Sequence, residues 1–191
     1  MKGSSHMLAT LVLATVLQQA MAVEIEGISV PDSVTLPGTT TQLQLNGAGV
    51  RSKFLFDIYV GALYLPAKSQ DSAGILADDA ATRVLMHFLY KEVSREKITH
   101  GWNEGLQANL PASEYQALQP RLAQFNKLFS SVRKGDRISI DYIPGSGTEV
   151  RINDEWRGKV EGNDFFRALL KVWLGPAPVS NKLRDAMLGR N

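Results

Sequence analysis

GAGVRSKFLFDIYVGALYL, from Gly47 to Leu65, decides the fold of this chain and carries its most informative residues. Two glycines open the stretch, and a residue without a Cβ tolerates positive φ and lets another backbone approach closely. The residues that follow are rich in aromatic and β-branched side chains, and no proline occurs before position 66. This composition predicts one strand, or two strands joined by a bend near Asp57.

Side chains alternate between the two faces of a strand, so residues of equal parity share a face. The stretch divides into two sets: Arg51, Leu55, Asp57, Tyr59 and Leu63 on one face, and Phe54, Phe56, Ile58, Val60 and Tyr64 on the other. An arginine and a tyrosine on one face of a mostly apolar strand indicate a functional site. A bulge at the bend would break this parity.

The flanking sequence predicts an α+β fold. Period-two patterns and turn residues predict strands within residues 23–46, 82–90, 136–143, 148–153 and 156–160. Helical spacing predicts helices over residues 69–80, 94–109, 111–132, 164–174 and 180–188, with a kink or break at Pro120. Strands, helices, a hairpin and further helices, without βαβ alternation, are typical of an antiparallel sheet with a separate helical layer.

The composition limits the classes of function. The 191 residues suit one domain, and the net charge of +2 without a clustered basic run argues against nucleic acid as a partner. The absence of cysteine excludes disulfides, thiolate nucleophiles and cysteine-based metal sites. His100 and Glu104 have the i,i+4 spacing of metal ligands on a helix, but no third ligand is evident. We therefore expect neither a metal nor a cofactor.

The N-terminal segment predicts export. Residues 1–7 resemble an expression-vector remnant, and residues 8–22 combine a short apolar run with the small-x-small sequence Ala20-Met21-Ala22. This pattern predicts a signal peptide cleaved after Ala22, and the run is too short for a transmembrane helix. The alternative is an N-terminal core helix. We expect a periplasmic or otherwise exported domain over residues 23–191, with no membrane span once the signal is removed.

Three motifs resemble a known family. GAGVR (residues 47–51) and IYVGALYL (residues 58–65) resemble the signature strands of the chalcone isomerase superfamily, and most of all its bacterial chalcone-isomerase-like, exported branch. The segment LGPAPVSNKLRDAM (residues 174–187) is similar to that family's closing two helices. The resemblance implies a chalcone-isomerase-like open-faced sandwich, in which a large antiparallel sheet carries a layer of helices on one face.

The resemblance also implies site residues. Arg51 matches the arginine that steadies the substrate's developing anion in the plant isomerases and grips the carboxylate in the fatty-acid-binding members; the alternative is a salt bridge with Asp57. Tyr59 matches a threonine of the plant enzymes and a tyrosine of the fatty-acid-binding branch; the alternative is a core tyrosine. Asn103 falls near a site asparagine, while Glu96 replaces a site tyrosine; the alternative for Asn103 is a solvent-facing position.

The sequence is compatible with three functions. The leading hypothesis is an exported binding protein for a small amphipathic ligand, a fatty acid or similar carboxylate or a phenolic compound, with Arg51 anchoring the charged head and Tyr59 and Asn103 also binding the ligand. The alternative is a cofactor-independent isomerase or intramolecular lyase, in which Arg51, Tyr59 and Asn103 are catalytic and Arg51 stabilises an oxyanion. The third is a ligand-free structural or partner-binding module, favoured if the chain's own side chains fill the sheet–helix cleft. No pattern predicts an oligomeric state.

Overall fold

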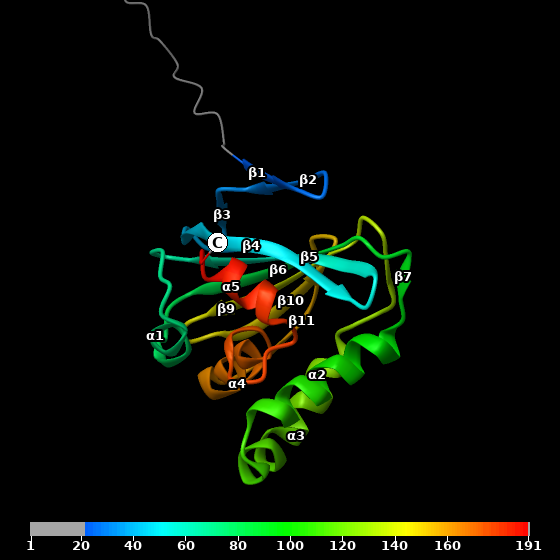
Figure 1. The fold of residues 1–191 in the computed structure, drawn as a ribbon. Helices are drawn as coiled ribbons and strands as arrows, with labels where there is room; N and C mark the ends of the chain where they lie inside the picture. Colours follow the sequence, from blue (N-terminus) through cyan, green and yellow to red (C-terminus); the bar gives the residue numbers. More distant parts are fainter. Residues whose placement is uncertain (1–21, 191) are drawn as a thin grey trace, which may run out of the picture.

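Residues 22–190, which the computed structural model describes, form an antiparallel sheet with helices on one face (Figure 1). Within them, seven strands pair in the order β11-β10-β9-β6-β5-β4-β3. Their bounds are β3 Ser33–Thr35, β4 Gln42–Lys53, β5 Phe56–Leu65, β6 Thr82–Phe88, β9 Arg137–Ile143, β10 Gly147–Ile152 and β11 Glu155–Val160. The predicted vector remnant and signal segment lie outside the described residues, apart from Ala22, where the first strand begins.

The helical layer and two short strand pairs complete the fold. The helices are α1 Ser72–Ala77, α2 Arg95–Asn109, α3 Ala112–Lys127, α4 Asn163–Leu174 and α5 Asn181–Met187. The short pairs are β1 Ala22–Ile25 with β2 Ile28–Pro31, and β7 Glu92–Val93 with β8 Val132–Arg133. The architecture is thus the predicted open-faced sandwich.

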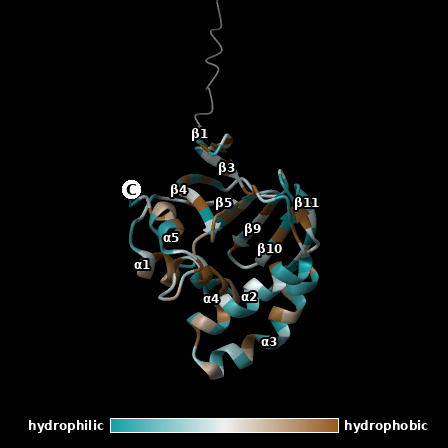
Figure 2. Cartoon of the chain, turned by 45° about the vertical axis from the view of Figure 1, so that its right-hand side comes forward, coloured by the Kyte–Doolittle hydropathy of each residue, from teal (hydrophilic) through white to brown (hydrophobic). Residues whose placement is uncertain are grey.

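The main hydrophobic core lies between the sheet and the helices. Helix α4 supplies eight buried residues to it, and Figure 2 shows hydrophobic colouring along this helix and the central strands. A smaller cluster covers the opposite face of the sheet, where Val30 of β2 and Leu36 pack over Val60 and Tyr64 of β5. Burial of apolar area on both faces explains why β5 is a nearly continuous apolar run.

Gly47 and Gly49 allow helix α5 to lie directly on β4. A Cβ built on Gly49 would lie 2.5 Å from the Ala186 Cβ, and one built on Gly47 would collide with the Ala186 carbonyl oxygen. Of the two reasons proposed for these glycines, close approach of another backbone is confirmed. Neither glycine has a positive φ.

The quoted stretch forms two strands, as one of the two sequence alternatives predicted, but the turn comes earlier than Asp57. Lys53 pairs with Phe56, so Phe54 and Leu55 form a two-residue loop. The sequence predicted that Leu55 and Asp57 share a strand face with Arg51. This was wrong for both residues, because Leu55 lies in the loop and Asp57 is exposed. The turn escaped prediction because it lacks the Asn-Gly or Gly-x residues that usually mark such loops.

Two further predictions need correction. Pro120 does not break α3, which runs through it from Ala112 to Lys127; the proline is exposed, so water can solvate the carbonyl that loses its partner. The same helix ends at Lys127 rather than near residue 132, since Val132 is extended and pairs with Val93 in the β7–β8 ladder.

Candidate functional site

Arg51 and Tyr59 lie directly opposite each other on β4 and β5. The Arg51 guanidinium carbon is 5.7 Å from the centroid of the Tyr59 ring, a cation–π distance. Cross-strand partners share a face of the sheet, and this face is the one that carries the helices. The structure therefore brings together two of the three site residues predicted from the sequence.

Arg51 has no carboxylate partner among residues 22–190. Its Nε–H is buried and donates no hydrogen bond within the described part of the chain, and no ion pair there includes Arg51. Asp57, the alternative partner considered from the sequence, instead accepts a 2.6 Å hydrogen bond from the Ser52 hydroxyl. A half-buried guanidinium without a counter-charge is costly, and an anionic ligand would remove that cost.

Tyr59 is buried and has a hydrogen-bond donor as its neighbour. The indole Nε1 of Trp173, on α4, donates to the Tyr59 hydroxyl oxygen at 3.1 Å. Burial raises the pKa of Tyr59, although the Arg51 charge and the Trp173 hydrogen bond act in the opposite direction. The hydroxyl is therefore protonated at neutral pH and can donate its own proton to an acceptor in the cavity described next.

A small inner cavity lies between the sheet and helix α2. Its volume is about 90 Å³. It is lined by Arg51, Ile58, Tyr59, Met86, Phe88, Val93, Lys97, Ile98, Gly101, Trp102, Val172 and Val179. This lining contains cations, N–H and O–H donors and apolar groups, but no acidic side chain.

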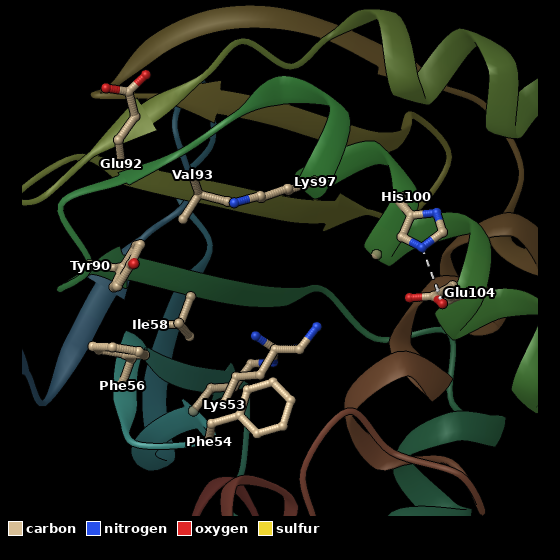
Figure 3. Close-up of a pocket in the computed structure, with 12 residues that line it drawn as sticks. Lys53, Phe54, Phe56, Ile58, Tyr90, Glu92, Val93, Lys97, His100 and Glu104 are labelled. Carbon is tan, nitrogen blue, oxygen red and sulfur yellow. Dashed lines mark ion pairs between the residues drawn. The ribbon is translucent and has the colours of Figure 1, made fainter.

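A larger outer cavity of about 370 Å³ adjoins the inner one (Figure 3). The two share Arg51, Ile58, Val93, Lys97 and Gly101. The outer cavity adds Lys53, Phe54, Phe56, Tyr90, Glu92, His100 and Glu104. Arg51 thus lies where the two cavities meet, with an apolar wall of aromatic and branched side chains on the outer side.

Trp102 is a site residue that sequence reasoning placed only in the core or the cleft lining. It is 4% exposed and packs among Phe125, Phe129 and Trp173. Its Nε1 is buried and has no hydrogen-bond partner among the described residues. The sequence carries no signal for this, because an unpaired donor depends on the tertiary contacts of the whole site.

Asn103, the third predicted site residue, does not line either cavity. Its Nδ2 donates a 2.8 Å hydrogen bond to the Thr99 carbonyl within α2. Glu96, at the position of the family's site tyrosine, is exposed, and a backbone hydrogen bond and one from Ser94 lower its pKa. The face of α2 that meets the sheet therefore presents Trp102 rather than Asn103.

His100 and Glu104 lie at the rim of the outer cavity and contact each other at 3.1 Å. Both side chains are exposed, and within residues 22–190 no three potential ligands cluster as a metal site would require. The prediction that Trp156 is a core or cleft-lining residue was wrong, because its side chain is 55% exposed and lines neither cavity.

Comparison with known proteins gives a family and a fold. A family model described as chalcone isomerase-like matches residues 22–189. The structure is similar to the crystal structure of a fatty-acid binding protein from Arabidopsis thaliana, with a TM-score of 0.62 and 17% sequence identity; the match covers 82% of this chain and 95% of that one. A search of curated protein sequences gave no match.

Proposed function

The chain belongs to the chalcone isomerase-like family, and from this we propose that it is an exported binding protein for a fatty acid or a similar amphipathic carboxylate. In this proposal, the carboxylate lies at the junction of the two cavities beside Arg51. The apolar tail lies along the outer cavity, against Phe54, Phe56 and Ile58.

The observation that carries the proposal is the set of unpaired donors around the inner cavity. Arg51 Nε and Trp102 Nε1 are buried and have no hydrogen-bond partner within residues 22–190, and the Tyr59 hydroxyl has a proton to donate. A carboxylate offers acceptors on two oxygens and a negative charge, so it can satisfy all three groups at once. A neutral or cationic ligand would leave the guanidinium without a counter-charge.

The dimensions support a ligand that leaves the main core intact. Buried side chains of α4 and the central strands pack against one another between the sheet and the helices, and the two cavities border this core. The outer cavity alone, at about 370 Å³, falls in the range of about 300–1,000 Å³ usual for ligand pockets. Each CH₂ of the tail buried there contributes about 0.8 kcal/mol before ordering costs, so the tail supplies affinity and Arg51 supplies orientation.

Export is part of the proposal and rests on the sequence of residues 8–22. The apolar run and the Ala20-Met21-Ala22 site have the form of a secretory signal, and a chain without cysteine is compatible with an oxidising compartment. None of the helices between residues 22 and 190 combines the length and apolarity needed to cross a membrane. N-terminal sequencing of the protein recovered from the periplasmic fraction of expressing cells would test export, and we expect a mature chain that begins at Val23.

The enzyme alternative draws on the same Arg51, which can stabilise an oxyanion as well as a carboxylate. It has less support, because Asn103 bonds within its own helix and lies outside both cavities. Loss of the yellow absorbance of a chalcone faster than the spontaneous rate would establish this alternative in place of binding alone.

Native mass spectrometry of freshly purified protein, followed by solvent extraction, tests the binding proposal. We expect a mass adduct that is extracted as a fatty acid and that is absent from Arg51→Met. If the purified protein carries no such adduct and also fails to bind added fatty acid in a titration, the binding proposal is wrong. The third hypothesis, a ligand-free structural or partner-binding module, then takes its place.

A further inference from the structure

The tip of the β4–β5 hairpin exposes three consecutive large apolar side chains. Phe54 is 90% exposed, Leu55 96% and Phe56 55%. Phe54 also has a φ of +55°, a conformation that is unusual for a bulky residue. A glycine or a polar residue would suit this two-residue loop better on both counts, so the requirements of folding do not explain the apolar tip.

The tip lies at the entrance of the outer cavity. Phe54 and Phe56 line that cavity together with Lys53, and Figure 3 shows these side chains beside Ile58 and Tyr90. The Phe56 and Tyr90 rings meet edge-to-face with their centroids 5.5 Å apart. A membrane or a macromolecule bound to the tip would therefore lie next to the proposed ligand site.

Two lysines lie beside the tip, Lys53 next to Phe54 in the chain and Lys97 in the lining of the outer cavity. Lys53 and Lys97 have no ion-pair partner within residues 22–190. Of the two acids at the cavity rim, Glu92 lies 3.6 Å from Arg133, and Glu104 contacts His100, which offsets the carboxylate charge only when the imidazole is protonated. Asp57 is the carboxylate closest in sequence to the tip, and it accepts the Ser52 hydroxyl bond.

We propose that the hairpin tip docks on a lipid bilayer that contains anionic lipids, with Phe54 and Leu55 entering the headgroup region. Lysines that flank exposed aromatic and aliphatic residues are the pattern of proteins that lie at such interfaces. A further step, in which the ligand passes between the bilayer and the outer cavity, rests on the proposed function.

The shape of the tip favours a bilayer over a second copy of the chain. A stable protein–protein interface needs about 800 Å² from each partner, formed by a broad complementary patch. The tip is a two-residue loop, and Ser52 and Asp57 behind it are already polar. A narrow apolar point can insert between lipid headgroups, which rearrange around it, without needing a matching surface.

The test is cosedimentation of the full chain with vesicles, comparing pure phosphatidylcholine with a mixture that contains phosphatidylglycerol. We expect binding to the anionic vesicles and a loss of at least tenfold in Leu55→Glu. Leu55 lines neither cavity, so this variant should bind fatty acid in vesicle-free solution as the wild type does. The matched control is Val23→Glu, an exposed apolar residue on the β1–β2 hairpin, which should sediment like the wild type.

Three results would overturn the docking proposal: no binding of the wild type to anionic vesicles, equal binding of Leu55→Glu, or a concentration-dependent dimer that Leu55→Glu abolishes. The two proposals fail separately. Leu55-dependent sedimentation without fatty-acid binding in solution would leave docking in place and refute the proposed function. Fatty-acid binding in solution without sedimentation would support the proposed function and refute docking on the bilayer.

Discussion

Trp173 and Tyr59 are joined by a 3.1 Å hydrogen bond between the indole Nε1 and the phenolic oxygen, and both side chains are buried. The bond links α4 to β5 across the main core and fixes the Tyr59 ring beside Arg51. Because Trp173 supplies the donor, the Tyr59 proton is left for another acceptor. This single contact therefore serves both the stability of the core and the proposed binding site.

Replacing Tyr59 by phenylalanine should lower the free energy of unfolding by about 1–3 kcal/mol, because the Trp173 N–H would be buried without an acceptor. Urea denaturation followed by tryptophan fluorescence measures this. Tyr115→Phe is the matched control, since Tyr115 on α3 is half-buried and its hydroxyl makes no hydrogen bond among the described residues. Equal stability of the two variants would show that the Trp173–Tyr59 bond contributes nothing.

Trp102→Phe should lose packing but no internal hydrogen bond. The smaller ring leaves space among Phe125, Phe129 and Trp173, so the free energy of unfolding should fall by about 1–2 kcal/mol, although the buried donor that is removed has no partner within residues 22–190. If Trp102 Nε1 donates to the ligand carboxylate, the affinity for a fatty acid should fall by about tenfold. Isothermal titration calorimetry decides this, and an unchanged affinity would remove Trp102 from the site.

Gly49→Ala should destabilise the fold by about 1–3 kcal/mol, because its Cβ would meet the Ala186 Cβ at 2.5 Å and force α5 away from β4. Gly101→Ala is the control: a Cβ there meets nothing within 4 Å, and alanine is favoured over glycine inside a helix. Thermal denaturation should give a lower Tm for the first variant and an equal or higher Tm for the second. A Gly49→Ala protein as stable as the wild type would contradict the close packing of α5.

How much of this could be read from the sequence depends on how local each feature is. The antiparallel sheet and its helical layer were predicted because alternation, helical spacing and turn residues are local. Arg51 and Tyr59 were correctly predicted to share a face of the sheet. The prediction used their equal parity along one strand, and in the structure they share the face because they are cross-strand partners. The Phe54–Leu55 turn was missed, since its residues are not typical of a tight hairpin.

The rest of the site depends on tertiary contacts. A helix rotates by about 100° per residue, so an error of one position exchanges the inward and outward faces. Asn103 was chosen from the resemblance, whereas the residue before it, Trp102, faces the core. Whether Trp102 Nε1 or Arg51 Nε finds a partner is decided by α4, β5 and their side chains together, and no local pattern records this.

Alkaline pH should destabilise the protein through its buried tyrosines. Burial raises the pKa of Tyr64 to about 12, and burial together with a hydrogen bond to Asp79 raises that of Tyr142 to about 12. The unfolded pKa is about 10, so these groups favour the folded state fully below pH 10 and lose that contribution as the pH rises to about 12.

Urea denaturation between pH 8 and 12, in steps of about one unit, measures this effect. The free energy of unfolding should fall over the upper half of the range, and less steeply in Tyr64→Phe, which cannot ionise at that position. Lysines also titrate there, so the comparison of the two slopes is decisive. Identical slopes would show that Tyr64 ionises as readily in the folded protein as in the unfolded chain.

The central claim is that Arg51 holds the carboxylate of an amphipathic ligand, and calorimetric titration of Arg51→Met tests it most directly. The titrants are a medium-chain fatty acid and the alcohol of the same length, and the control is Arg137→Met, an arginine on the opposite face that pairs with Asp154. A charged hydrogen bond contributes about 1.5–3 kcal/mol, so Arg51→Met should weaken the acid by at least tenfold and leave the alcohol nearly unchanged. An unchanged affinity for the acid, or an equal loss for acid and alcohol, would contradict the account.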